Sequence, residues 1–232
     1  MGEGMDCVAC SEGTYRGLGV SNCTLCPLGK YGPAEALEAC VRCGRGQYSN
    51  FRGQATCERC VAGKYLDLTS ATNESECNAS KPGSYSTEIG AESETTCQLC
   101  DAGKYSTIEG AGSPFVCSKC PAGTYLQTRG NRNISACVLS GLGKYSPTLG
   151  ATSELDCQDC KAGKYANCEK EYIGCRGFTD ESDCSQCTPG KFSQVTGATT
   201  ERTCQECTQG KYARMNASDE CIMCPQKSQL FS

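Results

Sequence analysis

The stretch CDAGKYSTIEGAGSPFVCSKC, residues 100–120, decides the fold of this chain. It begins with a cysteine, passes through Gly-Lys-Tyr, turns at Gly-Ala and ends in a Cys-x-x-Cys pair. Three kinds of structure share such a pattern: a disulfide-stapled hairpin, a zinc site and a thiol redox motif. The rest of the sequence selects among them.

The composition is too poor in large apolar residues for an ordinary hydrophobic core. Leu, Ile, Val and Phe together number 30 of 232 residues, and Trp is absent. A chain with so few of these residues tends to be disordered unless another element holds it together. The 24 cysteines are dense enough to indicate a disulfide scaffold or a metal-rich chain rather than an ordinary enzyme.

The sequence repeats itself along almost its whole length. Gly-x-Tyr occurs in eleven copies, with Phe replacing Tyr once, and in nine copies a cysteine stands three residues before the glycine. From Cys60 to Cys160 that position recurs every 20 residues. A fixed period is the mark of a repeat array, in which each repeat contacts mainly its neighbours. The aromatic residues of the motif are Tyr15, Tyr31, Tyr48, Tyr65, Tyr85, Tyr105, Tyr125, Tyr145, Tyr165, Phe192 and Tyr212.

A second glycine in the repeat predicts a turn. Gly90, Gly110, Gly130, Gly150 and Gly197 each lie seven residues before a cysteine. Because glycine accepts positive φ, we expect the glycine of Gly-x-Tyr to make one bend and the second glycine to return the chain. The sequence therefore predicts a small disulfide-rich repeat protein, an elongated array of short β-hairpins with little regular secondary structure. We expect each tyrosine ring to cover its own disulfide and the edge of the next repeat.

The segment CQLCDAGKYSTIEGAGSPFVCSKC, residues 97–120, resembles the ephrin-receptor-like cysteine-rich repeat, which is related to the growth-factor-receptor and tumour-necrosis-factor-receptor cysteine-rich modules. The resemblance extends from about Cys7 to Pro225. It implies extracellular, disulfide-bonded, rod-like modules, without implying a kinase or a particular ligand. The expected organisation is repeats 1–4 at 7–79, repeats 5–8 at 80–159, an enlarged repeat at 160–186, repeats 10 and 11 at 187–225, and a tail at 226–232.

The resemblance also implies a disulfide connectivity, which spacing alone does not select. In the related modules the cysteine before Gly-x-Tyr closes onto the first cysteine of the next Cys-x-x-Cys. Carried over to this chain, the pairs are Cys10 with Cys23, Cys26 with Cys40, Cys43 with Cys57, Cys60 with Cys77, Cys100 with Cys117, Cys120 with Cys137, Cys187 with Cys204, and Cys207 with Cys221.

Two repeats depart from this pattern. Ser80 and Ser140 stand where repeats 5 and 8 should begin with cysteine, so Cys97 and Cys157 lose their expected partners. The cysteines at the two edges of the array also have no partner in frame: Cys7 and Cys224.

The enlarged repeat carries two extra cysteines. We favour the pairs Cys160 with Cys184 and Cys168 with Cys175. An arrangement like that of the tumour-necrosis-factor receptor would instead give Cys157 one of the two inner cysteines.

The residues disfavour several functional classes. The chain contains no His, so a Ser-His or Cys-His catalytic pair is impossible, and two of the zinc knuckles that the spacing would allow are interrupted by serine. A thiol redox site needs a helix that follows a buried strand, which glycine-punctuated repeats do not offer. The formal net charge of -4 argues against nucleic acid as a partner. We expect no catalytic residue, no cofactor and no metal site.

Charged and polar motifs add two expectations about the surface. Lys occupies the middle of seven Gly-x-Tyr copies, and we expect its stem to cover the ring while its ammonium stays in water, with a glycan-binding or anionic-ligand stripe as the alternative. Five Asn-x-Ser/Thr sequons support a secretory context. Their asparagines are Asn22, Asn73, Asn78, Asn133 and Asn216.

The first ten residues contain neither a basic nor an apolar leader segment, and no apolar run is long enough to cross a membrane. We therefore expect an excised portion of a larger ectodomain, extracellular or at the cell surface, with no membrane contact of its own. Its expected role is structural spacing or recognition of an unidentified protein or glycan, with neighbouring repeats of a longer chain as further contacts. The alternative is a cytosolic zinc-binding or thiol-buffering protein, which predicts reduced cysteines and bound metal.

Overall fold

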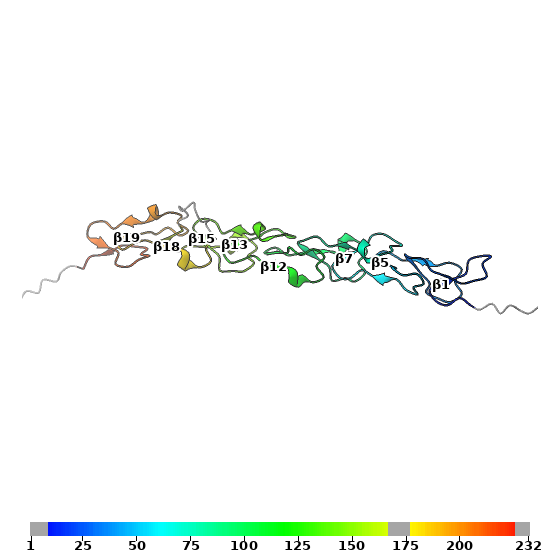
Figure 1. The fold of residues 1–232 in the computed structure, drawn as a ribbon. Coiled ribbons are helices and arrows are strands. Elements are labelled where there is room, and N and C mark those ends of the chain that lie inside the picture. The colour runs from blue at the N-terminus through cyan, green and yellow to red at the C-terminus, as the bar shows by residue number, and fades with distance from the viewer. Residues whose placement is uncertain (1–8, 167–176, 226–232) are drawn as a thin grey trace, which may run out of the picture. The chain divides into compact units, whose positions relative to one another are not determined.

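The computed structural model describes residues 9–166 and 177–225, and it consists of consecutive β-hairpins with two-residue strands (Figure 1). The first strand of each hairpin holds the last two residues of Gly-x-Tyr. These strands are β1 (Thr14–Tyr15), β3 (Lys30–Tyr31), β5 (Gln47–Tyr48), β7 (Lys64–Tyr65), β9 (Ser84–Tyr85), β11 (Lys104–Tyr105), β13 (Thr124–Tyr125), β15 (Lys144–Tyr145), β17 (Lys164–Tyr165), β19 (Lys191–Phe192) and β21 (Lys211–Tyr212).

The second strand of each hairpin holds the two residues that follow the closing-cysteine position, which is the position of the first cysteine of the next Cys-x-x-Cys. These strands are β2 (Thr24–Leu25), β4 (Val41–Arg42), β6 (Glu58–Arg59), β8 (Asn78–Ala79), β10 (Gln98–Leu99), β12 (Ser118–Lys119), β14 (Val138–Leu139), β16 (Gln158–Asp159), β18 (Ser185–Gln186), β20 (Gln205–Glu206) and β22 (Ile222–Met223). In most repeats they are the middle of Cys-x-x-Cys, and their pairing is antiparallel, so that Tyr65 lies opposite Asn78. The predicted small disulfide-rich array of short hairpins is confirmed.

Seven repeats also contain a 3-10 helix of one turn, which the sequence analysis did not predict. Each begins after an Asn, Ser, Asp or Thr that lies four residues before the closing-cysteine position. The helices are η1 (Glu74–Glu76), η2 (Glu94–Thr96), η3 (Pro114–Val116), η4 (Ile134–Ala136), η5 (Glu154–Asp156), η6 (Glu181–Asp183) and η7 (Glu201–Thr203). The other four repeats have disulfides that span only 13 or 14 residues, three or more fewer than the 17 typical of the helical repeats, and so lack the length for this turn.

The chain divides into two compact units. One takes Met1–Cys100, Ser106–Ser118 and Gly130–Arg132, and the other takes Asp101–Tyr105, Lys119–Arg129 and Asn133–Ser232. Each unit is built from the same hairpins, so the contacts below recur in both.

Backbone hydrogen bonds join each repeat to the next. In the first compact unit, Leu66 N donates to Ala91 O over 2.9 Å, and Gly90 N donates to Cys60 O over 2.7 Å. In the second, Leu126 N donates to Ala151 O over 2.9 Å. These bonds satisfy the polar groups of turns that have no long strand to pair with, so adjacent repeats complete each other's hydrogen bonding.

Contacts also reach past the adjacent repeat, in addition to the hydrogen bonds between neighbours. A Cβ built on Gly63, in repeat 4, would lie 2.0 Å from Gly110 O, in repeat 6. A Cβ built on Gly103, in repeat 6, would lie 2.2 Å from Gly150 O, in repeat 8. The turn of a repeat therefore rests directly on the glycine of Gly-x-Tyr two repeats earlier, which only a residue without a side chain permits.

Candidate functional site: the stapled repeat junction

Nine disulfides join cysteines among residues 9–166 and 177–225, with Cα–Cα distances from 5.5 to 6.1 Å. Every one of them joins two cysteines that the sequence analysis expected to be partners. The pairs are Cys10–Cys23, Cys26–Cys40, Cys43–Cys57, Cys60–Cys77, Cys100–Cys117, Cys120–Cys137, Cys160–Cys184, Cys187–Cys204 and Cys207–Cys221. Cys7 and the expected pair Cys168–Cys175 lie outside the described residues.

The two cysteines of a Cys-x-x-Cys belong to different staples. Cys57 is bonded back to Cys43, whereas Cys60 is bonded forward to Cys77. Strand β6 lies between them, and side chains three positions apart on an extended strand face opposite sides. The motif therefore links successive staples; its two sulfurs do not act together on one metal ion or on each other.

Aromatic rings cover the staples. Tyr48 is only 6% exposed and packs in one apolar cluster with Leu66, Ala71, Cys60 and Cys77. These two cysteines form the staple of the following repeat, whereas the staple of the repeat to which Tyr48 belongs is not part of the cluster.

The second compact unit contains an equivalent cluster. Tyr145 packs with Cys160, Cys184 and Ala166, and Phe178 is packed against them. In both clusters, then, the ring covers the staple of the next repeat. Repeat 8, to which Tyr145 belongs, has no staple of its own, so the expected cover over the ring's own disulfide is contradicted at Tyr48 only.

The hydroxyl of Tyr48 is held by the residue opposite it in the hairpin. Tyr48 Oη donates to Glu58 Oε2 over 2.9 Å. Burial, together with this bond to a carboxylate, raises the pKa of Tyr48 to about 12. Tyr85 and Tyr145 donate in the same way to the glutamines opposite them, over 2.9 and 2.8 Å.

We expect Tyr48 to ionise late in an alkaline titration. Because folding raises its pKa from 10.0 to about 12, the stability that it contributes is complete below pH 10 and is lost as the pH rises towards 12. The measurement is tyrosinate absorbance against pH for the wild type and Tyr48→Phe, and the difference curve should have its midpoint near 12. Glu58→Gln should lower that midpoint only in part, since burial is the larger cause. A midpoint near 10 in the wild type would contradict the buried, bonded ring.

Ion pairs neutralise several lysines of the Gly-x-Tyr motif. Lys64 Nζ lies 3.1 Å from Glu74 Oε1, and Lys144 Nζ lies 2.8 Å from Asp159 Oδ1. Lys191 pairs with Glu201 over 3.7 Å. Because these ammonium groups already have carboxylate partners within their own repeats, the alternative of an anion-binding lysine stripe is weakened.

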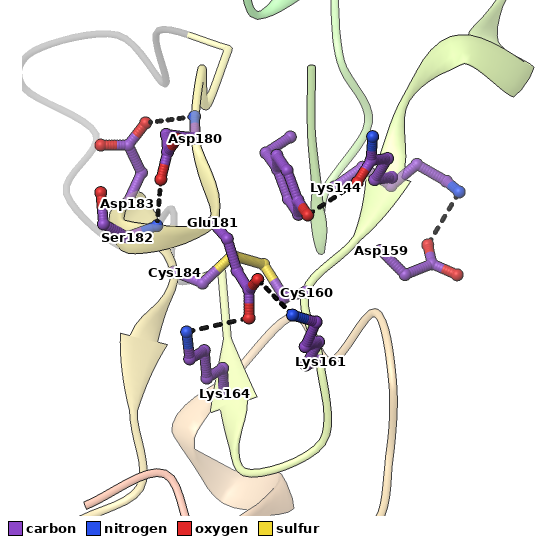
Figure 2. The surroundings of a disulfide bond; sticks show 12 residues. Lys144, Asp159, Cys160, Lys161, Lys164, Asp180, Glu181, Ser182, Asp183 and Cys184 are labelled. Atoms are coloured by element: carbon purple, nitrogen blue, oxygen red, sulfur yellow. Dashed lines mark hydrogen bonds and ion pairs between the residues drawn. A yellow bond between two sulfur atoms is a disulfide. The ribbon is translucent and has the colours of Figure 1, made fainter. Parts of the chain in front are cut away.

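The enlarged repeat concentrates its charges around the Cys160–Cys184 staple (Figure 2). Glu181 forms two ion pairs: Lys161 Nζ lies 2.7 Å from Glu181 Oε2, and Lys164 Nζ lies 3.0 Å from Glu181 Oε1. Hydrogen bonds from these two lysines lower the pKa of the Glu181 carboxyl. The neighbouring carboxylates have structural partners as well.

Two aspartates of the enlarged repeat form a capping box on η6. Asp180 Oδ1 accepts from Ser182 N over 2.8 Å, and Asp183 Oδ2 accepts from Asp180 N over 3.1 Å. Asp183 Oδ2 also accepts from Thr179 N over 2.8 Å. The bond from the Thr179 backbone is the first cause of the lowered pKa of Asp183. The acidic run therefore serves the helix turn and the lysines.

Three thiols of the described residues are free. Cys97 is half-buried, Cys157 is buried and Cys224 is exposed. Burial raises the pKa of both the Cys97 and the Cys157 thiol, which keeps them protonated and weakly nucleophilic at neutral pH.

All five sequon asparagines are exposed: Asn22, Asn73, Asn78, Asn133 and Asn216. Two of them also cap 3-10 helices. Asn73 Oδ1 accepts from Ser75 N over 2.9 Å, and Asn133 Oδ1 accepts from Ser135 N over 2.8 Å. These bonds use the amide oxygen, whereas a glycan modifies the amide nitrogen, so capping and glycosylation use different atoms. Glycosylation at these five positions stays a prediction.

In the part of the chain that the structure describes, no group of three or more His, Cys, Asp or Glu side chains is placed to hold a metal ion. The same residues contain no helix that is long and apolar enough to span a bilayer.

The stapled hairpins define the class of this chain as a small disulfide-rich repeat protein. Residues 29–77 match the family model described as tyrosine-protein kinase ephrin type A/B receptor-like. This segment carries complete staples at Cys43–Cys57 and Cys60–Cys77, and over these residues the chain is similar to ephrin-receptor-like cysteine-rich repeats. A search of curated proteins finds no match.

Proposed function

We propose that this chain is an extracellular, non-catalytic repeat array that serves as a structural or protein-recognition segment of a receptor-like or surface protein. The observation that carries the proposal is the set of nine disulfides in register with the repeat. Disulfides persist in oxidising compartments and are rare in the cytosol, so they disfavour the cytosolic zinc-binding alternative. The receptor-like family match at 29–77 supports the same location.

A structural role suits the way in which the repeats are joined. Staples, backbone hydrogen bonds and the contact across two repeats hold each turn in place, although few large side chains are buried. The carboxylates described above already cap helices or pair with lysines, which leaves the exposed side chains of the hairpins to meet a protein or glycan ligand. We assign no residue a catalytic role.

The first test is the intact mass of the chain after secretion from eukaryotic cells, deglycosylation and denaturation without reductant. Each bridge removes two hydrogens, and peptide mapping should recover the nine pairs of the described residues. A metal assay of the native protein is run beside it. A fully reduced mass with bound zinc would overturn the extracellular proposal and favour the cytosolic alternative.

A further inference from the structure

The side-chain hydroxyl of Ser80 is buried, and it makes no hydrogen bond in the described structure. Ser80 stands where repeat 5 would begin with a cysteine, and it is 0% exposed. Its backbone is used, because Ser80 N donates to Gly63 O and Gly110 N donates to Ser80 O, both over 2.8 Å. Within the described residues, its Oγ has no hydrogen-bond partner. Burying a hydroxyl that gains no hydrogen bond costs its hydration free energy without compensation. Alanine at this position should therefore stabilise the folded site at least as well.

Ser140 provides the comparison, because it replaces the same cysteine in repeat 8. Its Oγ is bonded to Lys144 O over 3.5 Å, and its side chain is only half-buried. The two serines differ in sequence context as well: Ser80 is the third residue of the sequon Asn78-Ala79-Ser80, whereas residue 138 is valine and no sequon precedes Ser140.

Asn78 lies where an added sugar has room. It is the first residue of β8, its side chain is exposed, and it lies opposite Tyr65. In repeats 3 and 8 the residue in this position is Glu58 or Gln158, whose long side chain accepts a hydrogen bond from the tyrosine hydroxyl. Among the described contacts no hydrogen bond joins the shorter Asn78 to Tyr65. The first sugar on Asn78 would extend over the same face of the hairpin as that ring.

We propose that Asn78 is a glycan attachment site that is filled before repeats 4 and 5 fold, and that the Ser80 hydroxyl serves this step. Attachment needs a hydroxyl residue two positions after the asparagine, and once folded Ser80 is closed to any enzyme. In the transfer, Asn78 Nδ2 loses a proton and bonds to the anomeric carbon of an oligosaccharide, and the diphosphate of the lipid-linked donor leaves. The inference rests on the proposed extracellular function.

The test uses the full chain, secreted from eukaryotic cells behind an added leader, with glycopeptide mass spectrometry at Asn78. We expect occupancy in the wild type and in Ser80→Thr, and none in Ser80→Ala. Ser140→Ala is the matched control and should leave Asn78 occupied. An unmodified Asn78 in a secreted chain whose disulfides are intact would overturn this inference alone, whereas a chain with neither disulfides nor glycans would overturn the proposed function too.

Two further measurements separate the timing from a structural role. Microsomal membranes, which supply enzyme and donor, should modify Asn78 in the nascent chain but not in the refolded, disulfide-bonded chain; equal modification of both would refute the order of events. The thermal midpoint of Asn78→Gln should be unchanged or raised when Ser80→Ala is added. A clear fall would mean that the hydroxyl stabilises the folded repeat.

Discussion

Replacing Gly63 with alanine is expected to destabilise the first compact unit far more than replacing Gly190 with alanine destabilises the second. Both glycines have φ near +87°, where a side chain loses about 1–2 kcal/mol in either position. At Gly63 the new Cβ would also lie 2.0 Å from Gly110 O, a backbone atom, whereas nothing lies within 4 Å of a Cβ on Gly190. Gly110 is itself fixed by the bond from its N–H to Ser80 O. The difference between the two variants therefore isolates the contact across two repeats.

The measurement is denaturant unfolding of both variants with disulfides intact, together with peptide mapping of the staples after secretion. Gly190→Ala should fold with native pairing and a slightly lower midpoint. Gly63→Ala should show a much lower midpoint or mispaired cysteines, because the new Cβ would clash with the turn at Gly110. Equal midpoints for the two variants would show that the backbone contact between repeats two apart is not formed in solution.

Ser140→Cys is expected to add a staple to repeat 8. Cys157 is buried and free, and the separation of 17 residues between positions 140 and 157 equals that of the staples Cys60–Cys77 and Cys120–Cys137. Closing a loop of this length restricts the unfolded chain and stabilises by about 3 kcal/mol. The engineered pair should therefore raise the unfolding midpoint.

Thiol titration and intact mass give the direct readout for this variant. Ser140→Cys should contain one free thiol fewer than the wild type, because Cys157 is paired while Cys97 and Cys224 stay free, and peptide mapping should recover the pair. Ser140→Ala serves as the control for loss of the hydroxyl and should leave Cys157 reactive after unfolding. One free thiol more than in the wild type, counted in folded Ser140→Cys, would mean that repeat 8 does not share the hairpin geometry of its stapled neighbours.

Much of this fold could be predicted from the sequence because its determinants are local. The period of Gly-x-Tyr marks the hairpins, and the glycines mark turns whose positive φ the structure shows at Gly90 and Gly110. The pairing of Cys160 with Cys184 followed from keeping the frame through the enlarged repeat. Both conclusions need only neighbouring residues or one repeat length.

The features that sequence reasoning missed depend on contacts across repeats or on a weaker signal. Nothing near Gly63 indicates that Gly110 rests on it, because the two are separated by a whole repeat. The 3-10 helices did have a signal: Asn73 and Ser93 each stand four residues before a cysteine, as N-cap residues of a turn. The pairing of Lys64 with Glu74 likewise required the position of that helix.

The two repeats without a staple also determine how the chain would respond to a pulling force. Elsewhere in the regular repeats, consecutive loops are closed by disulfides, and only the pairs of residues inside Cys-x-x-Cys can lengthen. Residues 78–99 and 138–159 lie outside any closed loop, and each could be drawn out to at most about 75 Å. Under tension, extension would begin in these two segments, so the substitutions at Ser80 and Ser140 give the described array two segments of defined length that no disulfide keeps from extending.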